Sequence, residues 1–209
     1  MRKVLLVVGL FLAAVVAHAA PVNVTLLGFS GGNWQNGYPY YITFGPGGSI
    51  QTAMCDDYLH GGAPGESWLA NVTVLGTDNL SLARFNMMQN ALTLYDEAGW
   101  ILLQTPFTSN SQWKDMNYAV WHIFDNAVPL DSGAQGWLNA AQAEAALGFP
   151  GVDFNKVFIL TPVNQYDQNL NNPQEYLYID PPGGSTPEPG TFVLLGSGAL
   201  MLFRRKLLG

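Results

Sequence analysis

The chain has 209 residues, of which 48% are hydrophobic and 11% are charged, and its formal net charge is −7 at pH 7. Aromatic and β-branched residues are too plentiful for a disordered polymer, so the composition predicts a folded domain. Five of the eight Lys and Arg lie near the two ends, which leaves the stretch between them with three cations, fourteen acidic residues and a net charge of −11. This charge argues against nucleic acid and anionic membrane surfaces as partners.

The N-terminus has the pattern of a secretory signal peptide. Arg2 and Lys3 precede an apolar run at residues 4–16, and Ala17 and Ala19 supply the small residues of a cleavage site. A transmembrane anchor is the alternative, but the run is short for a spanning helix. The sequence therefore predicts a signal peptide at residues 1–19 and an exported protein.

The C-terminal tail reads Pro187-Glu188-Pro189, then an uncharged stretch at 191–203, then Arg204-Arg205-Lys206. A helix over 191–203 would be about 20 Å long at ~1.5 Å per residue, which is shorter than the ~30 Å hydrocarbon core. A buried core helix is the alternative, but such a helix has a polar face that this stretch lacks. Cations on one flank are typical of membrane segments, and their long stems can reach the interface. The tail thus predicts a short transmembrane helix with a basic stop.

These tail residues resemble the PEP-CTERM sorting signal of Gram-negative bacteria. The resemblance implies that Pro187, Glu188 and Pro189 form the sorting motif and that the basic cluster after the helix is the membrane stop. It also implies that an exosortase of the inner membrane recognises and removes the tail. The protein would then be anchored only transiently before it reaches the cell surface or extracellular matrix.

Four ranges follow from these signals. We expect a signal peptide at 1–19, a folded extracellular domain at 20–180, a linker at 181–186 and the sorting signal at 187–209. The folded part has the length of one ordinary domain.

Hydrophobic periodicity within the folded part predicts strands at 22–29, 38–44, 50–58, 67–75, 156–160 and 175–179. It predicts helices at 80–103, 111–126 and 133–147, the first with a possible break at Gly99. The order of four strands, three helices and two strands is typical of a segregated α+β fold.

The second predicted helix has one strongly apolar face. That face carries Trp113, Asn117, Val120, Trp121 and Phe124, which are spaced as neighbours on one side of a helix. A buried asparagine needs partners for its amide, so we expect Asn117 to hydrogen-bond a neighbouring strand.

Cys55 is the only cysteine, so it cannot form an internal disulfide. His60 and His122 are not at zinc-ligand spacing from it, and no metal or other cofactor is expected. A cysteine hydrolase would pair the thiol with one of these histidines. Acidic neighbours at 56 and 57 would raise the thiol pKa, which is the wrong direction for a nucleophile. A small buried side chain is the simpler interpretation.

A second resemblance involves the same residues. Met54-Cys55-Asp56 on a strand, followed by Asn117-x-Ala119-Val120-Trp121 on a helix, resemble the thioester domains of bacterial surface adhesins. This resemblance implies an antiparallel β-barrel or sandwich of about six strands with a helical insertion of about three helices. In that family the strand cysteine is joined to a glutamine. Asn117 stands at the glutamine position and is one methylene shorter, so we expect no internal thioester between Cys55 and Asn117.

Two classes of function remain open. The first is a non-enzymatic surface or matrix protein with a binding or structural role, whose partner could be an exopolysaccharide or another surface component. The second uses the chemistry of Cys55, either as a covalent adhesin or as a secreted cysteine-dependent hydrolase.

Overall fold

The computed structural model describes residues 20–30, 39–77, 79–105, 109–164 and 173–179. The expected signal peptide, linker and sorting signal lie outside these residues. Within the described residues, no helix has the length and apolar character needed to cross a bilayer. The folded body, Pro21–Gly184, forms one compact unit of its own.

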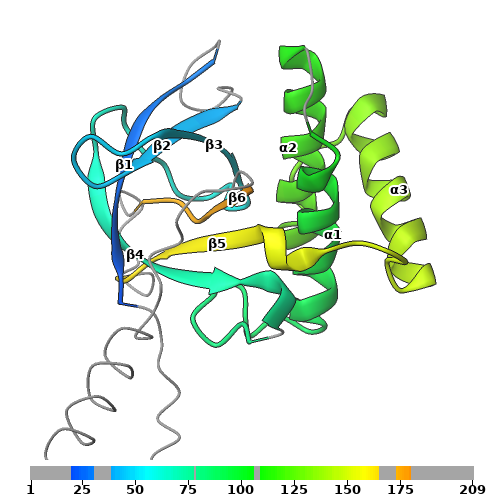
Figure 1. Cartoon of the computed structure of the whole chain (residues 1–209). Coiled ribbons are helices and arrows are strands. Elements are labelled where there is room, and N and C mark those ends of the chain that lie inside the picture. Colours follow the sequence, from blue (N-terminus) through cyan, green and yellow to red (C-terminus); the bar gives the residue numbers. More distant parts are fainter. Residues whose placement is uncertain (1–19, 31–38, 78, 106–108, 165–172, 180–209) are drawn as a thin grey trace, which may run out of the picture. The chain divides into compact units, whose positions relative to one another are not determined.

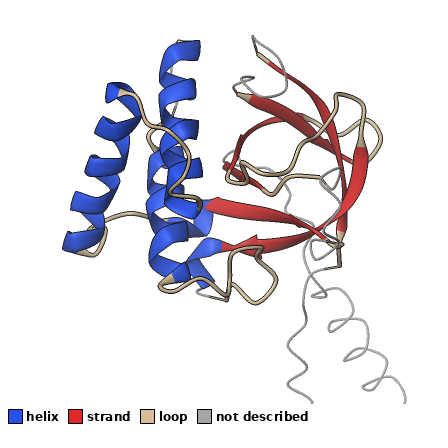
Figure 2. Ribbon diagram, turned by 180° about the vertical axis from the view of Figure 1, so that it is seen from behind, coloured by secondary structure: helices blue, strands red, loops and turns tan. Residues whose placement is uncertain are grey.

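Six strands close into a barrel in which every neighbouring pair is antiparallel, in the order β1-β2-β3-β6-β5-β4. The strands are β1 (Val22–Phe29), β2 (Tyr40–Phe44), β3 (Ile50–Cys55), β4 (Ser67–Val74), β5 (Val157–Pro162) and β6 (Tyr176–Ile179). The barrel and the helices beside it appear in Figures 1 and 2. The predicted α+β class and six antiparallel strands are confirmed, and the barrel is the correct one of the two expected architectures.

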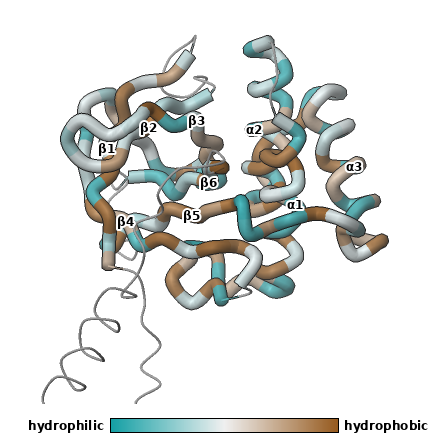
Figure 3. The backbone as a smooth tube through the Cα atoms, in the orientation of Figure 1, coloured by the Kyte–Doolittle hydropathy of each residue, from teal (hydrophilic) through white to brown (hydrophobic). Residues whose placement is uncertain are grey.

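Side-chain alternation explains why these segments form strands. In β1, Val24 and Leu26 are fully buried, whereas the alternate position Leu27 is exposed. This period of two places one face of the strand in the barrel interior. β5 is buried at every position and forms one of the hydrophobic stretches of Figure 3.

Three helices pack on one side of the barrel (Figure 1). They are α1 (Ala91–Leu103), α2 (Asn110–Phe124) and α3 (Ser132–Leu147). α1 contacts β6 and α2 contacts β3, whereas α3 packs on α1 and α2 (Figure 2). The expected core face of α2 is confirmed, since all five of its predicted residues are buried.

Local chemistry sets the helix ends. The side chain of Ser109 accepts a hydrogen bond from the Gln112 N–H at the start of α2, and Asp131 accepts one from Ala134 N–H at the start of α3. Gly148 ends α3 with a left-handed φ of 73°, a conformation that favours glycine.

The prediction of one helix over 80–103 was wrong, because α1 begins only at Ala91. Residues 80–90 form successive turns instead. The Arg84 N–H donates to the Glu175 carboxylate at 2.8 Å and the Phe85 N–H donates to the Tyr95 hydroxyl at 3.1 Å. These donors are therefore taken by side chains and are unavailable for a helical ladder.

Two smaller corrections concern Gly99 and the end of the third strand. α1 runs through Gly99 without a break, and a Cβ there would lie 2.6 Å from Leu75 Cδ2. The glycine thus permits close packing. β3 ends at Cys55 and not at residue 58, which places the cysteine at the end of the strand.

Candidate functional site

The structure brings Cys55 and Asn117 together at the contact between β3 and α2. The Cys55 N–H donates to Asn117 Oδ1 at 3.3 Å, and Asn117 Nδ2 donates to the Cys55 carbonyl at 2.9 Å. Both residues are almost completely buried. The asparagine amide therefore satisfies both backbone groups of one cysteine, as expected for a buried asparagine.

The position of this contact follows from the strand register. β2 pairs with β3 only as far as Tyr40 opposite Ala53, while β6 continues to Tyr176 opposite Cys55. Beyond Ala53, one edge of β3 has no strand partner among the described residues. The Asn117 side chain lies at this edge and supplies the hydrogen bonds that another strand would give.

The Cys55 sulfur has its own partners in the chain that follows it. The Asp57 N–H lies 3.3 Å from Sγ, and Sγ lies 3.2 Å from the Asp57 carbonyl oxygen. Burial raises the pKa of the Cys55 thiol well above its usual value, and Asp56 raises it further, although a hydrogen bond from Trp121 opposes them. The group is therefore a protonated thiol at neutral pH, which is a poor nucleophile.

The two candidate histidines are held elsewhere. His60 Nδ1 lies 2.9 Å from Asp57 Oδ1, and burial lowers the pKa of His60. His122 Nδ1 lies 2.7 Å from the carbonyl oxygen of Val128. Neither interaction involves the sulfur, so the geometry gives no support to a Cys–His pair for hydrolysis.

A buried polar cluster beside the cysteine was missed by the sequence analysis, and Glu175 is its centre. Glu175 is fully buried. Its Oε1 accepts from the Tyr95 hydroxyl at 2.5 Å, and its Oε2 accepts from the Arg84 N–H at 2.8 Å and from the Thr161 hydroxyl. The carboxylate thus links the start of β6 to β5, to α1 and to the turns before α1.

Arg84 and Asp57 extend this cluster, and both side chains are buried. The Arg84 guanidinium pairs with Asp57 Oδ2 and also donates to the Pro173 carbonyl at 3.0 Å. Arg84 is the only arginine between Arg2 and Arg204. A single arginine in so acidic a body is the signal that could have pointed to a buried ion pair.

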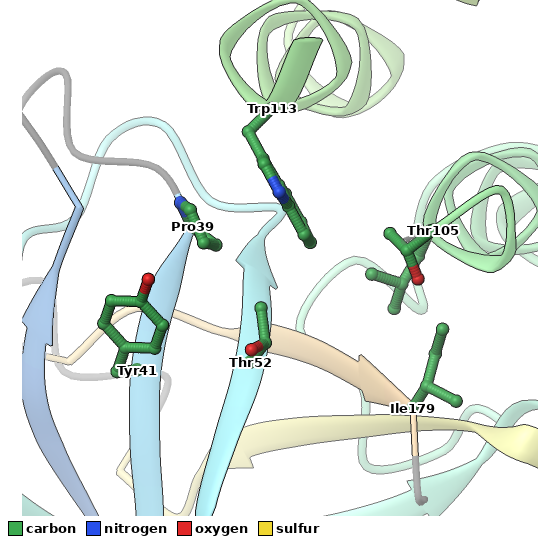
Figure 4. Close-up of a pocket in the computed structure, with 7 residues that line it drawn as sticks. Pro39, Tyr41, Thr52, Thr105, Trp113 and Ile179 are labelled. Carbon is green, nitrogen blue, oxygen red and sulfur yellow. The ribbon is translucent and has the colours of Figure 1, made fainter. Parts of the chain in front are cut away.

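A separate cavity of about 320 Å³ lies between the barrel wall and the helices (Figure 4). In Figure 4 the Trp113 ring points from α2 towards Thr52 and Thr105. The lining residues are Pro39, Tyr41, Thr52, Leu102, Thr105, Trp113 and Ile179. None of these is an Asp, Glu, His, Lys, Arg or Cys. The described residues also contain no group of three or more His, Cys, Asp or Glu that could hold a metal ion.

Comparison with known proteins gives one structural likeness. No protein-family model matches the chain, and no curated protein matches it. Among solved structures, the chain is similar to the N-terminal thioester domain of a surface protein from Clostridium perfringens. The two share 12% identity with a TM-score of 0.48, and the match covers 77% of this chain and 98% of that chain.

Proposed function

We propose that the protein is an exported cell-surface or extracellular-matrix component whose folded domain binds its partner without a covalent bond. One observation supports this proposal above all. The side-chain amide of Asn117 is engaged on both sides by the Cys55 backbone. The residue at the glutamine position of the thioester family thus serves as a hydrogen-bonding clasp between β3 and α2.

The surroundings of the sulfur support the same proposal. Forming a thioester requires the sulfur to attack the amide carbonyl carbon and the amide nitrogen to leave as ammonia. Here that nitrogen donates to the Cys55 carbonyl at 2.9 Å, and the thiol is kept protonated because burial raises its pKa. Asparagine also holds its carbonyl one carbon closer to its own helix than glutamine does. Moving α2 closer to β3 would disturb a close-packed contact.

Export and sorting complete the proposal, and they rest on the sequence of the two ends. The signal peptide directs the chain out of the cytoplasm, and an exosortase acts on the tail at Pro187-Glu188-Pro189. The helix at 191–203 and the Arg204-Arg205-Lys206 stop hold the chain in the inner membrane until then. The acidic body suits a neutral or cationic partner better than a polyanion, and an uncharged exopolysaccharide is one such partner.

Mass spectrometry of the unreduced protein tests the clasp. We expect the sequence mass, with one thiol that titrates after unfolding. A mass lower by one ammonia, with an amine nucleophile adding at residue 117, would instead establish the second candidate, a covalent adhesin. The covalent adhesin is the second candidate because the Asn117 amide lies in contact with the Cys55 backbone.

Intact-mass measurement of protein from the native host tests the sorting. We expect a chain that begins near Ala20 and ends near Pro187. A mature surface species that still carries Arg204-Arg205-Lys206 would contradict removal of the tail. This result is independent of the thioester measurement.

A further inference from the structure

Asp56 and Glu175 are neighbours across two strands. β3 and β6 pair antiparallel with Cys55 opposite Tyr176, and the Asp56 N–H then donates to the Glu175 carbonyl at 3.4 Å. Residues directly opposite in an antiparallel pair project their side chains to the same face. Both carboxyl groups are fully buried, so two acids lie side by side out of contact with water.

Three hydrogen-bond donors surround the Glu175 carboxyl group. Its two oxygens accept from the Tyr95 and Thr161 hydroxyls and from the Arg84 N–H. An ionised carboxylate is an acceptor only and has about four lone-pair sites, so these three donors leave one site for a further hydrogen bond.

The surroundings of the Asp56 carboxyl group differ from those of Glu175. Within the described part of the protein, no donor makes a hydrogen bond of ordinary geometry to either of its carboxyl oxygens. The nearby Arg84 guanidinium pairs with Asp57 instead. A fully buried carboxylate without donors is strongly disfavoured, whereas a neutral carboxylic acid carries an O–H that can donate to an adjacent carboxylate.

We propose that Asp56 and Glu175 share one proton and form a buried proton-binding site that joins the barrel to the helices. Asp56 is the acid that donates, and Glu175 is the carboxylate that accepts. Burial raises the pKa of Asp56 well above its usual value, the adjacent Glu175 raises it further, and Arg84 opposes the shift. The site goes beyond the proposed surface function and does not depend on it.

The proton site lies where the barrel contacts α1 and α2. Asp56 directly follows Cys55, which Asn117 of α2 holds, and Glu175 binds Tyr95 of α1. Loss of the shared proton would leave two adjoining buried anions that repel each other. A rise in pH would therefore weaken the contact of the barrel with α1 and α2, and a fall in pH would strengthen it.

The pH window follows from the groups around the pair. Burial raises the pKa values of Cys55, Tyr95 and Tyr176, all of which titrate above neutrality even when unperturbed. Asp57 and the guanidinium of Arg84 form an ion pair. His60, beside Asp57, has a lowered pKa and contributes a pH dependence of opposite sign. This contribution is common to wild type and any Asp56 variant, so it cancels in a comparison.

The raised pKa of Asp56 determines whether stability rises or falls with pH. Between about pH 3.9, where an unfolded aspartate titrates, and the higher folded pKa, the folded protein keeps a proton that the unfolded chain has released. Stability from this group is complete below that range and is lost as the pH rises through it.

Urea unfolding of the full chain at steps from about pH 5 to 8 tests the proposal with Asp56→Asn. The amide keeps an N–H donor towards Glu175 but cannot lose a proton. Relative to this variant, the wild-type unfolding constant should rise by up to about tenfold per pH unit, the dependence produced by one proton. Glu144→Gln, which removes a carboxylate from α3, should retain the wild-type slope. Parallel curves for wild type and Asp56→Asn would overturn the proposal, as would a stability that depends on added calcium or a chelator at fixed pH.

Infrared spectroscopy covers the case in which Asp56→Asn does not fold. Exposed carboxyl groups are ionised at pH 7, so a carboxylic-acid C=O band in the native protein reports a buried proton. Glu97 is another buried carboxyl group with a raised pKa, so we expect the band at pH 7 in both wild type and Glu97→Gln, and its disappearance on unfolding. A native spectrum without it would refute the shared proton.

Discussion

Asn117 pairs with Cys55 as a neighbouring strand would, through one N–H···O bond of 3.3 Å and one of 2.9 Å in the reverse direction. A helix side chain thus continues the sheet pairing past the point where β2 begins. The pair fixes the distance between α2 and the end of β3. It also turns the amide towards the cysteine backbone, which explains why contact with Cys55 need not lead to reaction with its sulfur.

Asn117→Asp changes one atom type at this contact. The variant loses the donor to the Cys55 carbonyl and places an ionisable group in a site that is 1% exposed. We expect the free energy of unfolding to fall by about 1–3 kcal/mol, the usual effect of an unsatisfied buried group. Urea denaturation measures the loss, with Asn126→Asp at an exposed position as the control. Equal midpoints for the two variants would show that the clasp contributes nothing.

Tyr95→Phe tests the Glu175 cluster. The tyrosine hydroxyl donates to Glu175 at 2.5 Å and accepts from the Phe85 N–H at 3.1 Å. Its removal should lower the free energy of unfolding by about 1.5–3 kcal/mol, because one of the two bonds involves a charged acceptor. Tyr58→Phe, at an exposed tyrosine, should change stability by no more than about 0.5 kcal/mol. A similar small change in both variants would contradict the role given to the hydroxyl.

Trp121→Ala tests the core face of α2. The ring is 2% exposed and packs against Tyr58 and Tyr118 with centroid separations of 5.0 and 5.2 Å. Truncation should lower the free energy of unfolding by about 3–5 kcal/mol, as for other buried aromatic residues. Leu147→Ala, at a position that is 70% exposed, is the control and should stay within about 0.5 kcal/mol of wild type. A tryptophan variant as stable as this control would mean that the ring is not part of the core.

Cys55 should react with thiol reagents only when the protein opens. The side chain is fully buried, and its raised pKa reduces the thiolate fraction near pH 8. We therefore expect native protein to be labelled at a rate that rises with urea, while the unfolded chain is labelled at once. Labelling of native protein at the rate of a free thiol would exclude the buried position. The same raised pKa means that stability from the protonated thiol is lost as the pH rises beyond about 8.5, the value of an unperturbed cysteine.

Periodicity predicted the parts of the fold in which local and tertiary preferences agree. β1 alternates between buried and exposed positions, and the apolar stripe of α2 lies against the barrel, so both were found from sequence. Apolar residues such as Leu80 and Ala83 lie at helical spacing and therefore predict a helix at 80–90, and both side chains are buried. What decides their conformation is Glu175 and Tyr95, whose side chains take the local N–H groups. Hydrogen bonds to side chains outside the segment leave no pattern in the sequence of residues 80–90 themselves.

The candidate site was only half predictable for the same reason. The resemblance to a known family pairs Cys55 with Asn117, and the structure places these two residues in contact. Arg84 and Glu175 are 91 positions apart and lie in a turn and at the start of a short strand. Only closure of the barrel by β6 brings them together. The sequence shows that they are charged, but it does not show that they are buried.

The order of strands around the barrel has a consequence for how the chain becomes a finished protein. β6 is the last strand among the described residues, and it pairs with both β3 and β5 to close the barrel. Until residues 176–179 have been synthesised, β3 and β5 each keep one unpaired backbone edge, and such edges are templates for association with other chains. The barrel also closes late in folding, because β3 pairs with β6, which lies more than 120 residues further along the chain. A chain that ends anywhere before β6 would thus keep two unpaired sheet edges, and we expect it to aggregate more readily than the full chain.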